Sequence, residues 1–433
     1  MLLLPTGYYL TGGALAVAAS FIALLLVPPA LLARIARQRL QLFAFRDRLR
    51  FLSSFAGFLV LLALIVAGFV GSRDPLSNPL PLTVWTLMWI GLTLIQGLFG
   101  DLSWWINPWY APARAIRALL GRTQVSSLPA SIAYWPAVVL FFCFAWFELI
   151  YPAPDDPFRL AYAAAVYFLI NLVCCVVYGA DRWLTQGECL SVFFSMIARF
   201  GILDWSGGRL ALRWPGAKLR DTEPLPLSGV LFLLLALASV SFDGLSKTFL
   251  WLGLNGFNPL EYPGRTALTA TNTTGLVLTF VMLSAAFFGS IWLGEKLPGR
   301  NRTLEAASTL VWSIVPIALA YHFSHYLTAL TVNGQYALVA LSDPFSLGWN
   351  LFGTADNQVS AGIVMGSDSV WVLWNLQAGA IIGGHILAVA AARLLAGRLP
   401  ETSRPFLAEL PLTVLMIAYT VFGLWLLSTP TAA

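Results

Sequence analysis

The chain has 433 residues, of which 58% are hydrophobic and 10% are charged, with a mean hydropathy of +0.77 and a formal net charge of +5. Soluble domains carry roughly 25% charged residues, so a soluble globular protein is excluded, and disorder is excluded because it requires low hydrophobicity. Four cysteines are too few for a secreted disulfide scaffold of this length. The composition predicts an all-α, polytopic transmembrane helical bundle that forms a single integral membrane domain over residues 1–433.

Ten hydrophobic segments are long enough to cross a bilayer, because a helix of about 18 residues or more spans the hydrocarbon core. The segments have few or no charges, and Glu148 is the one carboxylate inside them. The predicted helices cover 10–32, 51–71, 82–100, 132–151, 160–180, 225–242, 275–294, 306–332, 370–392 and 410–428.

The first segment predicts a retained helix rather than a cleavable signal peptide. No Lys or Arg precedes it, no small-residue cleavage site ends it, and Arg34, Arg37 and Arg39 follow at once. We therefore expect the N-terminus to lie outside the cell.

The distribution of basic residues predicts the remaining topology. With the N-terminus outside, 21 of the 25 Lys and Arg residues fall in the five predicted inner loops, as the positive-inside rule requires. Both termini are then outside. Loop orientation also explains the pI near 9.1, so no nucleic-acid partner is expected. The four basic residues left on the outer side are Arg73, Arg159, Lys247 and Arg265.

The cysteines lie at positions that do not suit disulfides. Cys143, Cys174 and Cys175 fall within predicted helices and Cys189 falls in an inner loop, so we interpret all four as small apolar side chains. The segment 189–203 is apolar enough to predict a helix lying in the membrane interface.

Ionisable side chains at membrane depth are costly and mark candidate functional sites. From the helical rise of about 1.5 Å per residue, we expect Glu148, Asp243, His322 and His325 to lie about 24 to 28 Å above the inner ends of their helices. These side chains share one layer in the outer third of the membrane.

Two amides belong to the same layer. Measured from the outer end of their helix, Asn375 and Gln377 lie about 8 and 10 Å deep. Such amides could donate hydrogen bonds to a ligand held in this layer.

The histidine pair suggests a metal site. His322 and His325 are three residues apart on one helical face, and a carboxylate from Asp243 or Glu148 would complete a set of two histidines and one carboxylate with an open position for water. A divalent transition metal, zinc or copper, would make that water a nucleophile at neutral pH. The alternative is that these groups only bond interfacial water and helix termini.

His385 fits this layer poorly. It lies about 22 Å below the outer end of its helix, so a packing or hydrogen-bonding role is favoured. Sequence motifs of nucleotide-binding proteins, serine hydrolases and zincins are absent from the chain.

Several stretches resemble a known family. They are "LPTGYYLTGGALAVAASF" from Leu4, "VSFDGLSKTFLW" from Val240, "YHFSHYLTALTVNGQYALVALSDPFSLGWNLFGTAD" from Tyr321 and "VWVLWNLQAGAIIGGHILAVAAARLL" from Val370. Together they resemble the bacterial integral membrane proteins labelled fenitrothion hydrolase, over less than half of the chain. The family pattern includes a further His a few residues after His385, which is absent here.

The resemblance implies an organophosphate triester hydrolase in a bacterial inner (plasma) membrane, and it includes Asp243, His322, His325 and Gln377. The first hypothesis is therefore a metal-dependent hydrolase whose site faces outward and takes a lipophilic small molecule from the bilayer. In it, Asp243 and Glu148 supply carboxylates and Gln377 or Asn375 donates to the phosphoryl group.

The alternative hypothesis is a transporter, or a membrane subunit of a larger complex, that uses the same layer as a proton or metal-ion relay. The acidic, Lys-free stretch 333–369 is either a docking surface for a second protein subunit on the outer face or a lid whose short helices cover the polar layer.

Overall fold

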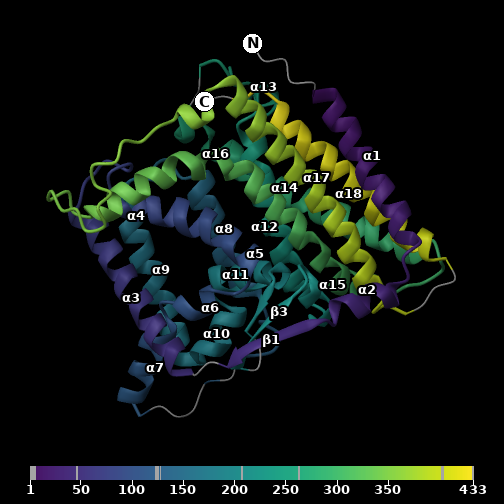
Figure 1. The fold of residues 1–433 in the computed structure, drawn as a ribbon, viewed down its shortest axis with the longest axis horizontal. Coiled ribbons are helices and arrows are strands. Elements are labelled where there is room, and N and C mark those ends of the chain that lie inside the picture. The colour runs from purple at the N-terminus through teal and green to yellow at the C-terminus, as the bar shows by residue number, and fades with distance from the viewer. Residues whose placement is uncertain are drawn as a thin grey trace.

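The computed structural model describes residues 6–44, 47–121, 126, 128–205, 208–261, 264–400 and 404–431. Within them, nine helical stretches are long and apolar enough to cross a membrane, which confirms an all-α, multi-pass membrane bundle (Figure 1). The nine stretches are Thr6–Leu25, Arg48–Val70, Pro79–Phe99, Pro157–Tyr178, Leu227–Ser246, Gly264–Lys296, Thr303–Ser342, Ser367–Ala396 and Pro405–Ser428.

The fourth predicted segment forms a shorter helix than expected. Helix α8, Trp135–Leu149, has 15 residues, so it extends about 22 Å and is shorter than a hydrocarbon core of roughly 30 Å. The side chain of Arg265 caps the C-terminus of α8, where its guanidinium donates to the carbonyl oxygens of Glu148 at 2.8 Å and Tyr151 at 3.3 Å. A cation at the C-terminus of a helix complements the helix dipole.

The first predicted segment is divided into two helices. Helix α1, Thr6–Leu25, ends before Pro28, and the short helix α2, Pro29–Ala36, begins with proline at its first position. Proline fits a first turn but breaks a continuous helix. A single helix over 10–32 was therefore a wrong prediction.

The third span contains a wide, π-helical segment. Helix α4, Pro79–Pro81, leads into the π-helix η1, Leu82–Leu92, which continues as α5, Thr93–Phe99. A π-helix of this length is rare and marks a place where neighbouring structure determines the backbone. Its Trp89 contacts the polar layer described below.

Two helices form the centre of the bundle. Helix α12, Leu227–Ser246, and helix α16, Ile314–Ser342, belong to the spans with the largest buried share, 83% each. Both are apolar around most of their circumference, as buried helices are. Three long helices pack beside them: α14, Gly264–Lys296; α17, Ser367–Ala396; and α18, Pro405–Ser428. Helices α3, Asp47–Val70, and α9, Pro157–Tyr178, pack against each other at another side of the bundle (Figure 1).

A small sheet at one end was not expected from sequence. Its three strands are β1, Arg39–Ala44, β2, Leu203–Asp204, and β3, Arg209–Arg213, in the antiparallel order β1-β3-β2. Four short helices also lie toward this end of the bundle: α6, Ser103–Ile106; α7, Tyr110–Leu119; α10, Ala180–Gln186; and η4, Ala217–Asp221.

The predicted interfacial helix is instead buried in protein. Helix α11, Cys189–Ile197, packs against α8 and α10 and continues as η2, Ala198–Phe200, with Val192 fully buried. The interfacial assignment was wrong because its apolar side chains enter the main core rather than lipid. All four cysteines are free, as expected.

The stretch 333–369 is more helical than predicted. Helix α16 continues to Ser342, an irregular segment follows, and η6, Gly362–Val364, precedes α17. Its role as a lid or docking surface stays a prediction.

The two terminal helices place both ends of the described chain on one side of the bundle. Helix α1 begins, and α18 ends, near α13, Phe249–Leu254, whereas the sheet lies at the opposite side (Figure 1). We call the first side the outer end and the sheet side the inner end, after the predicted topology. The remaining helical elements, α15, Thr303–Leu310, and η5, Val311–Ser313, lead into α16.

Candidate functional site

Asp243 is the centre of a polar cluster near the outer end. It lies in the last turn of α12, and its Oδ2 is 2.6 Å from Nε2 of His325 on α16. Its Oδ1 is 2.7 Å from Nζ of Lys247, one helical turn further on. The hydroxyl of Tyr326 donates to Oδ2 at 3.0 Å. A buried carboxylate requires such partners, and here it has three.

Tyr326 extends the cluster to a second carboxyl group. Its hydroxyl is also 3.1 Å from Oε1 of Glu148, at the end of α8. One hydroxyl proton cannot serve two carboxylates fully, so the arrangement is satisfied when one carboxyl carries a proton. Glu148, Asp243, Lys247, His325 and Tyr326 are called the outer cluster below.

The members of the outer cluster differ in exposure. The Asp243 side chain is 5% exposed, that of His325 is 24% and that of Lys247 is 51%. The carboxylate therefore lies behind the imidazole and orients it. The second ring nitrogen of His325, Nδ1, lies beside Gly244, where an added Cβ would be 3.9 Å away.

Lys247 lies just beyond the membrane-spanning part of α12. The Asp243 carboxylate raises the pKa of Lys247 above its ordinary value, while burial opposes this increase. The two opposite charges are four residues apart, a spacing that places side chains next to each other on a helix.

His322 points to a different neighbour from His325. Its Nε2 donates to the carbonyl oxygen of Trp89 in η1 at 2.8 Å, and its ring packs edge-on against the Trp89 indole at 5.1 Å between centroids. It is 4% exposed. In this position His322 joins α16 to the π-helical segment.

The described residues do not fit the predicted metal site. His322 and His325 direct their Nε2 atoms to Trp89 and Asp243 respectively, so the donors do not converge. No three His, Cys, Asp or Glu side chains in the described part of the chain are gathered as metal ligands. A zinc or copper ion therefore stays a prediction, to be tested by metal analysis of the purified protein.

The predicted amides lie outside the outer cluster. Gln377 Nε2 donates to the Ser324 carbonyl at 2.7 Å, and the Ser324 hydroxyl donates to the Gln377 carbonyl at 2.8 Å, which joins α16 to α17. Asn375 accepts a hydrogen bond from the Tyr9 hydroxyl at 2.7 Å. Both amides therefore connect helices, and a role in donating to a phosphoryl group stays a prediction.

A second polar group lies one turn inward along α16. The Tyr321 hydroxyl donates to the Tyr419 carbonyl at 2.9 Å, and the Tyr419 hydroxyl bonds the Ser241 hydroxyl. Fully buried His385 lies 6.3 Å and 6.2 Å, centroid to centroid, from these two tyrosine rings. Its Nδ1 donates to the Ile381 carbonyl, and its Nε2 has no hydrogen-bond partner among the described residues.

Sequence reasoning missed Tyr326 and Lys247. Lys247 follows Asp243 by four residues, and Tyr326 follows His322 by four, so helical spacing could have indicated both. The sequence analysis considered acids, histidines and amides at membrane depth, so it passed over the Tyr326 hydroxyl and treated Lys247 only as an outer-loop charge. The bridge from Tyr326 to Glu148 depends on the packing of α8 against the bundle, which sequence does not show.

Comparison with known proteins identifies no relative. No protein-family model, no curated protein and no solved structure matches the chain. The function is therefore inferred from the geometry and chemistry of the outer cluster.

Proposed function

We propose that this protein is a membrane-embedded hydrolase of neutral, lipophilic organophosphate triesters in a bacterial plasma membrane, with the outer cluster as its acid–base site. The observation that carries the proposal is the Asp243–His325 pair: a buried carboxylate 2.6 Å from a more exposed imidazole. A carboxylate that orients a histidine is a widespread general-base arrangement. The resemblance in the amino-acid sequence supplies the substrate class.

His325 is the proposed general base. With Nε2–H donating to Asp243, Nδ1 is the nitrogen that accepts a proton from water. The water oxygen forms a bond to phosphorus while the bond from phosphorus to the aryl oxygen breaks, and the phenolate leaves with the electron pair. Asp243 stabilises the imidazolium, and the proton then passes to solvent or to the phenolate.

Lys247 is the proposed hydrogen-bond donor to the substrate. An ammonium beside the dyad can stabilise charge that develops on the phosphoryl oxygen, while the single hydroxyl proton of Tyr326 serves the carboxyl groups of Asp243 and Glu148. Glu148 shares the Tyr326 hydroxyl and so positions it. A lipophilic triester concentrates in the bilayer, so a site near the outer leaflet is accessible to it.

Hydrolysis of fenitrothion by the purified full-length protein tests the proposal, with release of the coloured nitrophenolate as the readout. We expect turnover by the unaltered protein and a loss of about 10²- to 10⁴-fold in His325→Gln. Tyr336→Phe, on the same helix, is the matched control and should keep the rate. Absence of turnover, or equal rates in His325→Gln, would overturn the proposal.

A second function is favoured by a separate observation, the two polar groups that follow one another along α16. Tyr321 and His325 are one turn apart on one helical face. In this hypothesis, protons pass between the outer cluster and His385. This arrangement supports a proton-coupled transporter or a subunit of a larger complex.

Proton flux into liposomes that contain the protein and a pH-sensitive dye tests the second function. Flux driven by a membrane potential, and abolished in both Asp243→Asn and His385→Gln, would support it. Flux equal to that of protein-free liposomes would contradict it. The fenitrothion assay is independent of this result.

A further inference from the structure

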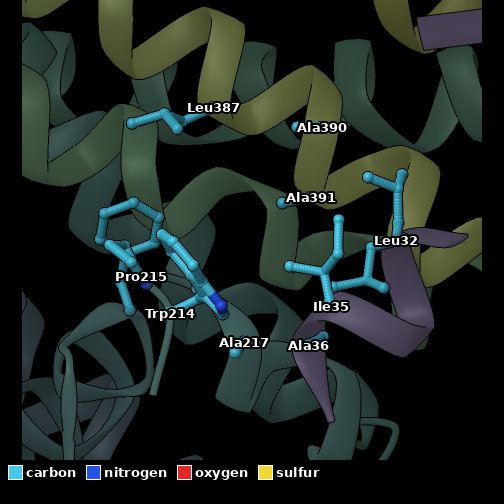
Figure 2. A pocket seen from close by; sticks show the side chains of 12 residues that line it. Leu32, Ile35, Ala36, Trp214, Pro215, Ala217, Leu387, Ala390 and Ala391 are labelled. Carbon is cyan, nitrogen blue, oxygen red and sulfur yellow. The ribbon is translucent and has the colours of Figure 1, made fainter. Parts of the chain in front are cut away.

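An apolar cavity lies at the inner end, between α2, the chain after β3 and α17 (Figure 2). Its volume is about 130 Å³, and its lining includes Ile35, Trp214, Leu387 and Leu394. Every residue that lines it is Leu, Ile, Ala, Phe, Trp, Pro or Gly. Such a cavity suits a hydrocarbon chain. The side-chain donor in its lining, the Trp214 indole N–H, is already bonded to Gln38.

The cavity opens at the level where the bundle leaves the membrane. Residues 387–394 occupy the inner third of the membrane-spanning helix α17. Helix α2 directly follows the first membrane span, and β3 belongs to the sheet at the inner end. In the predicted topology this end of α17 faces the inner leaflet, so a lipid of that leaflet is the ligand nearest to the cavity.

The apolar surface continues outward from the cavity. Ile35 and Trp214 are 39% and 56% exposed, and the neighbouring sheet pair Leu40 and Leu212 are 61% and 38% exposed. The Trp214 indole donates to the Gln38 side chain at 3.0 Å, which joins the two walls. Exposed tryptophan and leucine side chains at this level are typical of membrane interfaces.

Three arginines lie in the stretch of chain that forms one wall of the cavity. Arg34, Arg37 and Arg39 are exposed, and none takes part in an ion pair with another described side chain. Within α2, Leu32, Ile35 and Ala36 line the cavity, so the arginines of this segment lie on its other faces. Basic clusters beside a membrane span attract anionic lipids.

We propose that this cavity and its arginines form a binding site for an anionic phospholipid of the inner leaflet. One acyl chain occupies the cavity, and Arg34, Arg37 and Arg39 bind the phosphate headgroup. The charge of the surrounding residues selects this occupant over a neutral lipid or a second copy of the chain, which carries the same positive charge. The proposal does not depend on the function of the outer cluster.

Native mass spectrometry of the detergent-purified full-length protein tests the site. The probes are phosphatidylglycerol and phosphatidylcholine with identical acyl chains. The headgroup variant is Arg34→Gln, Arg37→Gln, Arg39→Gln, and the cavity variant is Ala390→Phe. The matched control, Arg114→Gln, Lys296→Gln, Arg302→Gln, removes the same charge from other inner loops.

We expect tighter binding of phosphatidylglycerol by the unaltered protein and the control. The headgroup variant should lose roughly fivefold per arginine, with little change for phosphatidylcholine. Ala390→Phe should weaken both lipids equally, because it occupies the acyl-chain position. The proposal is overturned by equal affinity for both lipids, by the same loss in the control, or by dimers in place of lipid adducts. Unchanged thermal unfolding of each variant shows that it folds.

Discussion

The outer and inner ends of the bundle use positive charge differently. At the outer end each predicted basic residue contacts a group of the protein: Lys247 binds Asp243, Arg265 caps α8, Arg73 binds Asp156 at 3.1 Å, and Arg159 donates to the Tyr151 hydroxyl at 3.3 Å. At the inner end Arg34, Arg37 and Arg39 are exposed. The few outer cations are therefore parts of local structure, whereas these inner arginines are available to the membrane surface.

The inner end also contains arginines of the first kind. Arg213 lies 2.7 Å from Asp204, and Arg393 forms an ion pair with Glu409. These side chains are about one-tenth exposed. Two groups of basic side chains can therefore be distinguished. One group is held in ion pairs or hydrogen bonds and stabilises the fold, and the other is exposed and orients the protein in the membrane.

Accessibility of single cysteines should give the largest effect, an all-or-none difference between the two ends. In a variant with the four native cysteines replaced by alanine, Arg37→Cys should react with an impermeant maleimide only in inverted vesicles. Glu261→Cys, beyond α13, should react only in intact cells. The opposite pattern would reverse the predicted topology.

Removing the shared acceptor of the outer cluster should destabilise the protein most. Asp243→Ala leaves His325, Lys247 and Tyr326 without their common partner, and breaking a buried pair costs about 3 kcal/mol or more. Arg37→Gln should stay within about 0.5 kcal/mol of the unaltered protein. Thermal unfolding in detergent measures both, and similar melting temperatures for the two variants would remove the distinction between the ends.

Tyr326→Phe should have a smaller effect. It removes the hydroxyl between Glu148 and Asp243, which contributes about 1 kcal/mol, while the other two partners of Asp243 remain. Tyr336→Phe, on the same helix, should leave the melting temperature unchanged. An equal loss in both variants would show that the bridge does not contribute.

The smallest effect should be a dependence on alkaline pH. Because the pKa of Lys247 is raised, its stabilising contribution is complete below the ordinary lysine value of about 10.4 and is lost as pH rises through the higher value in the folded protein. The difference in melting temperature between the unaltered protein and Lys247→Gln should be constant from pH 7 to about 9.5 and then decrease. Arginine stays charged, so the corresponding Arg37→Gln difference should not change; a constant Lys247→Gln difference would contradict this account.

Much of the fold followed from hydropathy, and its errors have two causes, a local break at a proline and a pairing between distant parts of the chain. Each predicted segment contains a helix because long apolar runs cannot be satisfied otherwise in lipid. The break at Pro28 was missed because the apolar run continues through the proline, and hydropathy alone does not register a helix break. The pairing of Arg39 with Arg213 in the sheet joins distant parts of the chain, for which no local pattern exists.

The candidate site was only partly predictable. Helical rise alone gives depth, and depth brought Glu148, Asp243 and His325 into one layer. Rotation of each helix about its axis decides contacts, and this separates His322, bonded to Trp89, from His325. The rotation of a helix about its axis depends on how several helices pack together, so it cannot be predicted from the hydropathy of a single segment.

The π-helical segment η1 has a consequence for changes in chain length. Each of its turns contains roughly one residue more than an α-helical turn. The segment Leu82–Leu92 therefore contains more residues than an α-helix would need to cover the same length. A single-residue deletion in an ordinary membrane helix rotates one end relative to the other. Here a deletion between residues 82 and 88 can be absorbed by tightening the coil, with Trp89 still beside His322. This segment is therefore the membrane-embedded place where we expect the chain to tolerate a change of length.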